Sequence, residues 1–295
     1  MNKDKSDKGL SLIVPVYNEI QMIGTVLKKL LKVLDSIEFP VELIVVDDGS
    51  TDGTTAILES FSGRIQFYRH TINMGYGAAL KTGVRQAMYP FVAITDADGT
   101  YPVERIPELF ESCVDGDFDM TVGARVGKSV TIPLIRKPAK WCIAKLANYL
   151  AGTRIPDVNS GLRVMQKEVV KKFLHILPDG FSFTTTITLA VLANGHTIQY
   201  IPIDYFHRKG KSKIRPIQDT FNFIQLIIRT VLYFNPLRVF VPLSVLLVVF
   251  AFIVLFGSWY IFGKAFDTSF GILIMTAVML AAVGMLADLI NKRIR

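Results

Sequence analysis

Three short apolar runs in the first hundred residues of this 295-residue chain each end in acidic side chains. In chain order these acids are Glu19, the pair Asp47 and Asp48, and the pair Asp96 and Asp98. If the runs are parallel strands of an open α/β sheet, their carboxyl ends share the edge where such sheets bind ligands. Carboxylates gathered there repel one another unless a cation lies among them, and alternate residues of an extended chain point to the same side. Asp96 and Asp98 are therefore candidate ligands of a hard divalent cation that also binds substrate phosphates.

A helix N-cap is the plainer explanation of any one of these acids, and for Asp48 or Asp52 alone it is as good as the functional one. Three acidic strand ends together favour a site. The first run is not followed by G-x-G-x-x-G, which argues against a dinucleotide-binding fold. The sequence also lacks G-x-x-x-x-G-K-[ST], which excludes a P-loop phosphate site. The four histidines show no metal-ligand spacing, and two cysteines exclude a disulfide scaffold.

The elements that must position these acids alternate along the first 125 residues. Strand-like runs cover 11–17, 41–50, 64–70, 91–99 and 119–125. Helical patterns lie between them, and the first has apolar residues at a spacing of about 3.6, namely Ile23, Val26, Leu27, Leu30 and Leu34. This alternation predicts an α/β fold, a mostly parallel sheet with helices on both faces.

The last sixty residues differ in character and explain a mean hydropathy of +0.38 in a chain with 20% charged residues. Residues 239–262 contain no charge, and 270–290 contain only Asp288. At about 1.5 Å per residue each segment is long enough to cross a hydrocarbon core of about 30 Å. The short connector predicts a transmembrane hairpin, and the alternative is a pair of buried core helices.

Basic residues predict the orientation of this hairpin. Arg229 and Arg238 precede the first span and three basic residues follow the second, whereas Lys264 stands alone in the connector. The positive-inside rule places the large N-terminal part and the C-terminus in the cytoplasm. The location that we expect is the cell inner membrane. The net charge of +8 fits an anionic bilayer surface, and no reader motif for nucleic acid accompanies it.

We therefore divide the chain into a cytoplasmic domain at 1–214, a juxtamembrane interface helix at 215–238 and two spans at 239–295. Segments 131–150 and 217–234 could lie in the interface as basic amphipathic helices, or pack on the domain as surface helices. Small residues in the second span could mediate a homo-oligomer, namely Gly271, Ala277, Ala281, Ala282 and Gly284.

Six motifs carry a resemblance to a known family. They are VPVYNE at 14–19, VVDDGSTDGT at 45–54, NMGYGAALKTG at 73–83, DADGTYP at 96–102, DVNSGLRVM at 157–165 and HRKGKSKI at 207–214. In this order they resemble the family 2 glycosyltransferases of GT-A fold. The last two narrow the resemblance to the polyprenyl-phosphate branch, which includes dolichyl-phosphate mannose synthase. The two-span tail is similar to bacterial members that make undecaprenyl-phosphate-glucose for O-antigen modification.

The resemblance implies site residues at the matching positions. Those expected to bind the base and ribose of a nucleotide sugar are Pro15, Tyr17, Glu19, Asp47 and Asp48. Asp96 and Asp98 match the family's metal-binding pair for Mg²⁺ or Mn²⁺, with Asp98 favoured as the direct ligand and also counted as catalytic. The residues expected on phosphates are Arg125, Arg208 and Lys213, and Arg208 is also counted as catalytic. Asp157 is the best-placed base, or else it orients a basic residue or the metal, or caps a loop. Many relatives have Gln after the metal pair, where this chain has Gly99, Thr100 and Tyr101.

The resemblance also implies the reaction. We expect inverting transfer of a monosaccharide, glucose from UDP-glucose being favoured, to a polyprenyl phosphate at the cytoplasmic membrane face. Mannosyl transfer from GDP-mannose is second. A processive polysaccharide synthase is a further alternative, although the chain lacks Q-x-x-R-W. A non-catalytic scaffold subunit is the alternative from another class. A phosphate monoester acceptor is mostly ionised near pH 7, so a strong base is less necessary than for a hydroxyl acceptor.

Overall fold

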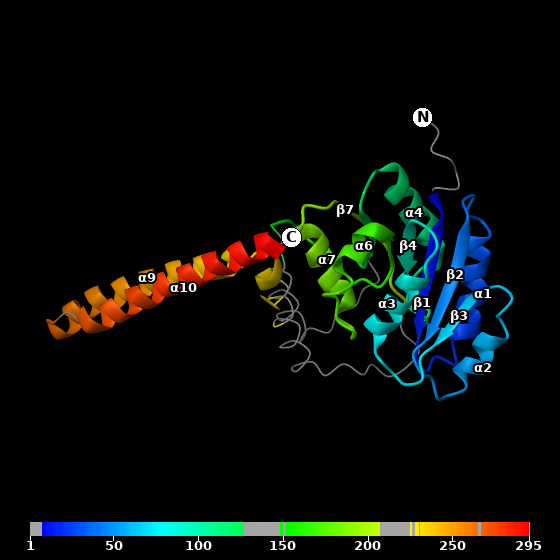
Figure 1. Ribbon diagram of the computed structural model, residues 1–295, viewed down its shortest axis with the longest axis horizontal. Coiled ribbons are helices and arrows are strands. Elements are labelled where there is room, and N and C mark those ends of the chain that lie inside the picture. The colour runs from blue at the N-terminus through cyan, green and yellow to red at the C-terminus, as the bar shows by residue number, and fades with distance from the viewer. Residues whose placement is uncertain are drawn as a thin grey trace.

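A helical hairpin projects from one side of an α/β domain in the computed structural model of the chain (Figure 1). The structure describes residues 8–126, 148–149, 152–206, 225, 228–229, 231–264 and 267–294. Most of segments 131–150 and 217–234 lies outside these ranges, so their interface character stays a prediction. Arg208 and Lys213 also lie outside the described residues.

One sheet forms the centre of the domain. Its strands, within the described residues, are β1 (Leu10–Val16), β2 (Val41–Asp47), β3 (Gln66–Arg69), β4 (Phe91–Ile94), β5 (Met120–Ala124), β6 (Arg163–Gln166) and β7 (Ile198–Pro202), in the spatial order β3-β2-β1-β4-β6-β5-β7. Strand β6 is antiparallel to both neighbours, and the other pairs are parallel. This confirms the predicted mostly parallel sheet. Because β6 runs in reverse, its beginning lies at the edge where the other strands end.

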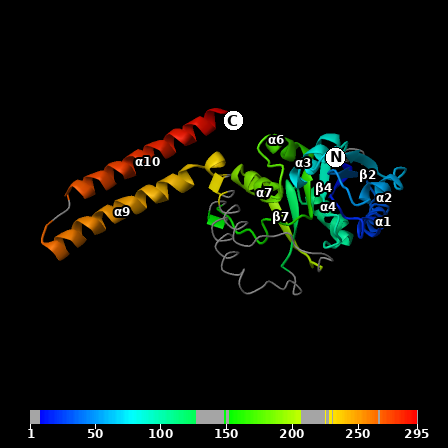
Figure 2. The same ribbon diagram turned by 90° about the horizontal axis from the view of Figure 1, so that it is seen from below.

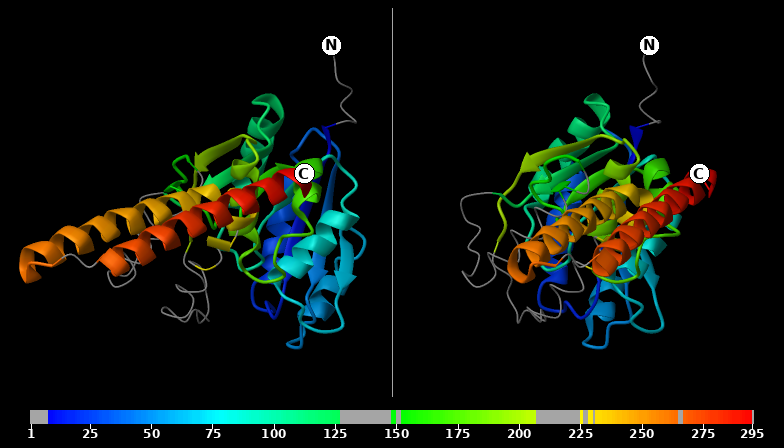
Figure 3. Two further views of the ribbon diagram at one scale, coloured as in Figure 1. Left: turned by 60° about the vertical axis from the view of Figure 1, so that its left-hand side comes forward. Right: turned by 90° about the vertical axis from the view of Figure 1, so that its left-hand side faces the viewer.

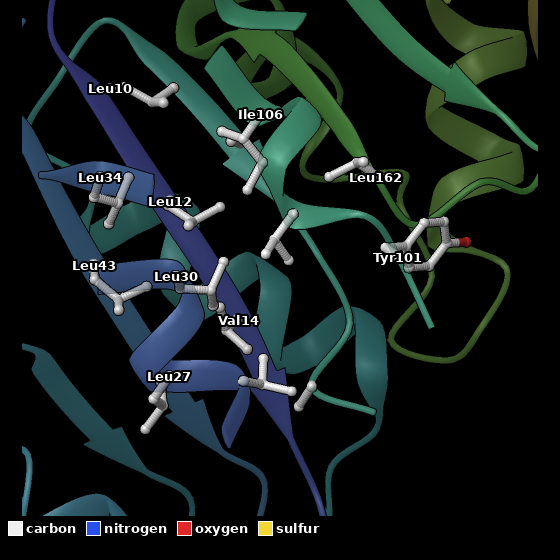
Figure 4. Close-up of a cluster of buried hydrophobic side chains, with 14 of the residues drawn as sticks. Leu10, Leu12, Val14, Leu27, Leu30, Leu34, Leu43, Tyr101, Ile106 and Leu162 are labelled. Atoms are coloured by element: carbon white, nitrogen blue, oxygen red, sulfur yellow. The ribbon is translucent and has the colours of Figure 1, made fainter. Parts of the chain in front are cut away.

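Helices cover both faces of the sheet, as expected. They are α1 (Ile23–Leu34), α2 (Thr54–Glu59), α3 (Tyr76–Gln86), the 3₁₀ turn η2 (Val103–Arg105), α4 (Ile106–Asp115), α6 (Lys167–Phe173) and α7 (Phe183–Ala193). Every residue of β1 is buried, and its side chains alternate between two apolar clusters. Leu10, Leu12 and Val14 face α1 and α4 in the first cluster (Figure 4), whereas Ile13 packs with α3, α6 and α7 in the second.

The hairpin consists of α9 (Leu237–Phe262) and α10 (Asp267–Ile294), each a few residues longer than the predicted span. The two helices lie side by side and leave the domain in one direction (Figures 2 and 3). Both are long and apolar enough to cross a membrane, and only 11% of the most apolar window of each is buried. The alternative of two buried core helices is therefore wrong.

Candidate active site

The loops that follow β1 and β2 are joined by hydrogen bonds at the carboxyl edge of the sheet. Asn18 has a left-handed backbone (φ 54°), and its N–H donates to Ser50 Oγ at 2.9 Å. The N–H of Thr51 returns a bond to Asn18 Oδ1 at 2.8 Å, and the N–H of Glu19 donates to Thr54 Oγ1 at 3.0 Å. Motifs 14–19 and 45–54 thus form one unit.

Three of the residues expected to bind the base and ribose, Pro15, Tyr17 and Glu19, belong to motif 14–19 in this unit. Pro15 is buried inside β1, beside Val46 of β2. Tyr17 is exposed at the edge, and Glu19 is half-buried just before α1. Their contacts with a nucleotide sugar remain predictions.

Asp47 and Asp48 are buried, and their carboxylates hold neighbouring loops in place. Asp47 accepts hydrogen bonds from the N–H of Ser50 at 2.9 Å and from Thr55 Oγ1 at 2.6 Å. Asp48 accepts from the N–H of Met74 at 2.9 Å and of Gly75 at 2.7 Å, and His70 Nδ1 lies 2.7 Å from it. The pair therefore shapes loops 49–53 and 72–75.

Asp52 lies one residue before Gly53, the N-cap residue of α2, and its carboxylate binds backbone N–H groups around the start of the helix. Its Oδ1 accepts the N–H of Thr54, the first residue of α2, at 3.0 Å, and its Oδ2 accepts the N–H of Ile20 at 3.2 Å. Asp48 is not an N-cap residue either, since its partners are His70 and the amides of Met74 and Gly75, just before α3.

Asp96 and Asp98 stand on a turn after β4. Ala97 and Asp98 belong to this turn, so the expected extended chain is wrong. Within the turn, Asp98 Oδ1 accepts the N–H and hydroxyl of Thr100, at 3.1 and 2.6 Å. A side-chain bond of this kind gives the backbone an alternative to continuing the strand.

Tyr76, at the start of α3, donates its hydroxyl to Asp96 Oδ1 at 2.9 Å. Burial and the neighbouring Asp96 carboxylate raise the pKa of the Tyr76 phenol well above its usual range. The phenol therefore stays protonated and keeps donating, which orients the Asp96 carboxylate.

The beginning of β6 comes directly against Asp96. The Gly161 N–H donates to the hydroxyl of Tyr101 at 2.7 Å. A Cβ at position 161 would lie 2.8 Å from Asp96 Oδ1, closer than atoms pack, so this approach requires glycine. The glycine of motif 157–165 thereby brings that motif to the carboxylates of motif 96–102.

Arg125 and Asp157 form a bidentate ion pair at the same edge. Arg125 Nε donates to Asp157 Oδ2 at 2.7 Å and Nη2 to Oδ1 at 2.9 Å. The backbone N–H groups of Arg125 and Asn159 add bonds at 3.1 and 3.2 Å. The Arg125 guanidinium also lies over the ring of Tyr205, 5.2 Å from its centre.

Burial alone would raise the pKa of Asp157, but the Arg125 guanidinium and the two amides outweigh it and hold this pKa below the usual range. The carboxylate is therefore ionised and engaged on both oxygens. Such a group is a weak base and an effective orienting partner, which favours the positioning alternative for Asp157.

Arg163 and Tyr76 are site residues that sequence reasoning missed. Arg163, the first residue of β6, is fully buried. It donates from Nε to the Ser160 carbonyl at 3.0 Å and from Nη1 to the Thr184 carbonyl and Thr188 hydroxyl at 3.1 and 2.9 Å. These bonds fasten the loop before β6 to α7. Arg163 belongs to motif 157–165, but an arginine is rarely expected inside a core.

The donor atoms at this edge fit a divalent cation held partly by substrate. Asp96 and Asp98 offer two carboxylates, each oriented by a hydroxyl donor, from Tyr76 and Thr100. Among the described residues no group of three or more His, Cys, Asp or Glu could hold a metal by itself. Mg²⁺ is commonly bound by one or two carboxylates together with substrate phosphates, which matches this donor set.

Comparisons with known proteins agree with the geometry. The sequence model described as glycosyl transferase family 2 matches residues 11–174. A dolichyl-phosphate hexose transferase of Haloferax volcanii is 31% identical over 70% of this chain and 87% of its own length. A polyprenol monophosphomannose synthase of Mycolicibacterium smegmatis is 27% identical over 69% and 80%. These matches confirm the resemblance carried by the six motifs.

A solved structure of similar fold is glucosyl-3-phosphoglycerate synthase from Mycobacterium tuberculosis in complex with uridine diphosphate. It superposes with a TM-score of 0.59 at 19% identity, over 77% of this chain and 81% of that one. The likeness confirms the GT-A-like fold of the domain.

Proposed function

Because the chain belongs to glycosyl transferase family 2, we propose that it transfers one sugar from a nucleotide sugar to a polyprenyl phosphate. The named relatives act on such lipids, and they include an undecaprenyl-phosphate 4-deoxy-4-formamido-L-arabinose transferase of Pectobacterium carotovorum, 28% identical over 79% of this chain. UDP-glucose is the proposed donor, on the resemblance of the two-span tail noted in the sequence. GDP-mannose is the second candidate.

The observation that carries this proposal is the Arg125–Asp157 ion pair. Inverting transfer needs an acceptor oxygen lined up behind the anomeric carbon, and a hydroxyl acceptor would also need a strong base. A phosphate monoester has a second pKa near ~6 and arrives mostly ionised. An Asp157 that is ionised and occupied by Arg125 suits such an acceptor better than a hydroxyl.

The donor diphosphate would be held by charge. Asp96 and Asp98 would bind Mg²⁺ or Mn²⁺, which when bound neutralises the departing nucleoside diphosphate. Arg208 and Lys213 are proposed phosphate contacts. Tyr17, Glu19 and the loops shaped by Asp47 and Asp48 are proposed to receive the base and ribose. Preorganised charges of this kind act where charge develops in the transition state.

A transfer assay tests the proposal. Membranes containing the protein are incubated with an undecaprenyl phosphate and each of several radiolabelled nucleotide sugars, and the lipid product is identified by mass spectrometry. We expect a single hexose on the lipid phosphate, with UDP-glucose the best donor. A polymer would instead indicate a processive synthase, and absence of turnover with every donor would indicate a scaffold subunit.

We further propose that α9 and α10 cross the membrane with both termini in the cytoplasm. The α9–α10 connection contains one basic residue, Lys264, whereas the last turn of α10 contains two, Lys292 and Arg293. Basic residues are enriched on the cytoplasmic side of a membrane. In intact cells, a Ser269→Cys variant should react with an impermeant thiol reagent added from outside, and a matched Lys5→Cys variant should not. Labelling at position 5 and protection at 269 would reverse the orientation.

A further inference from the structure

The segment that carries Asp157 has little regular structure of its own. Residues 152–162 contain no helix or strand, only turns and bends before β6 begins. Its shape must therefore come from contacts with other parts of the chain. One set is the Arg125–Asp157 pair, and a second set comes from the base of the hairpin, defined here as residues 231–239.

Apolar side chains join the hairpin base to this segment. Ile155, Leu189 of α7 and Val231 form a buried cluster, and Val158 and Val239 pack against it. Ile155 and Val158 flank Asp157 in the chain. The hairpin base and α7 therefore cover the apolar side of the segment, while the Asp157 carboxylate is turned to Arg125.

A polar contact joins the same two parts. Arg238 Nη1 donates to the Tyr149 carbonyl at 3.4 Å. Gly152 has φ +74°, and a Cβ there would lie 2.7 Å from the Arg238 guanidinium nitrogens, so the arginine lies directly on the backbone at the start of the segment. The N–H of Ile155 donates to Asn148 Oδ1 at 2.8 Å, which is a bond between the segment and residues 148–149.

The hairpin base is itself fixed from two sides. Phe234 is buried in the cluster between α3, α6 and α7, and its ring meets Phe173 edge-on at 5.9 Å. Asn291, near the end of α10, donates to the Tyr233 carbonyl at 2.6 Å. Residues 231–239 therefore contact α10 through Asn291 and continue directly into α9.

We propose that the hairpin base positions the segment 152–162, with Val231 and Arg238 as positioning residues that act on Asp157 through Ile155 and Gly152. Placing the hairpin in a bilayer fixes its base, so the site is completed where a lipid acceptor is presented. The kinetic part of this inference rests on the proposed function. Its structural part does not.

Hydrogen exchange of the full-length protein in nanodiscs, without substrate, tests the structural part. Val231→Ala should speed exchange of a peptide covering 152–162 by about tenfold, because the amides of that loop lose protection when it opens locally. A peptide covering β1 should not change. Val245→Ala is the matched control, because Val245 is an exposed residue of α9 and undergoes the same truncation.

A second variant separates positioning from loss of folding. Arg238→Lys keeps the charge but removes the planar group that lies on Gly152, and it should loosen the same peptide. Equal protection of 152–162 in wild type, Val231→Ala and Arg238→Lys would overturn the proposal, whether or not the transfer assay succeeds. Faster exchange of all peptides alike in both variants would also overturn it, since it indicates global destabilisation.

Kinetics then test the coupling to turnover. A misplacement of about 1 Å can cost roughly 10²-fold in rate, so Val231→Ala should lower kcat between about tenfold and 10²-fold with the donor KM unchanged. The conservative variant Val231→Ile, which keeps a branched apolar side chain, should have the kcat of the wild type. In an Asp157→Asn background Val231→Ala should cost nothing further, because both act through one loop. A rise in acceptor KM alone would contradict positioning and indicate only membrane attachment.

Discussion

Replacing Asp98 with alanine is expected to abolish sugar transfer while leaving the fold intact. Asp98 stands on the turn after β4, where its Oδ1 accepts two bonds from Thr100. As the more direct candidate ligand, it would help to neutralise the leaving diphosphate, an effect worth several kcal/mol of transition-state stabilisation. The expected loss in kcat is about 10³-fold or more.

Three measurements check this result. Turnover is measured with the favoured donor, donor binding is measured by calorimetry with and without Mn²⁺, and the melting temperature reports the fold. Asp115→Ala is a control of equal size, because Asp115 is an exposed residue at the end of α4. Full activity of Asp98→Ala, or of the wild type in excess EDTA, would refute the metal role.

The fold was predictable where local pattern and tertiary position agree. An uninterrupted apolar run such as 11–16 is typical of a strand buried on both faces, and β1 is such a strand. Acids after these runs predicted a site at the carboxyl edge, because strand direction decides which ends meet. The α9–α10 hairpin was equally predictable, since the length of an apolar segment and its lack of charge are local properties of the sequence.

The finer geometry of the site was not predictable, because it depends on pairings that are distant in sequence. Arg125 and Asp157 are 32 residues apart and meet only because β6 runs antiparallel beside β5. Whether Asp96 and Asp98 follow an extended chain or a turn depends on the Thr100 hydroxyl. Arg163 contradicts the usual exposure of arginine, and only its carbonyl partners in the folded chain make its burial acceptable.

Removing the charge of Asp157 is expected to destabilise the domain and to slow transfer only moderately. Asp157→Asn leaves the Arg125 guanidinium, about three quarters buried, without its anion. Breaking a buried pair by removing one partner costs about 3–5 kcal/mol, and the partial exposure here places the expectation near ~3 kcal/mol. If Asp157 positions Arg125, the fall in kcat should stay below the ~10²–10⁴-fold typical of a lost general base.

The charge-neutral double variant separates the two effects. Arg125→Met with Asp157→Asn removes both charges, so much of the lost stability should return, since no ion is left unpaired. Chemical denaturation of the two single variants and the double variant measures this. A double variant that is less stable than either single variant would show that the pair is not the source of the loss.

The pH dependence gives the sign of the stability effect. The folded-state pKa of Asp157 is lowered, so the stability that the carboxylate contributes is fully present above its unfolded pKa of about 3.9 and is lost as pH falls through the folded value. Wild type and Asp157→Asn should therefore differ by a constant amount between pH 5 and 8 and converge only in strong acid.

Turnover should follow a different group over that same range. If the acceptor phosphate arrives ionised, the rate of both wild type and Asp157→Asn should rise with phosphate ionisation near pH ~6. The attack is then limited by bringing two anions together, which is the task proposed for Arg208 and Lys213 and the reason that Asp157 needs to hold Arg125 in place. A loss of 10²-fold or more in Asp157→Asn, with stability, donor binding and metal affinity unchanged, would instead identify Asp157 as the base.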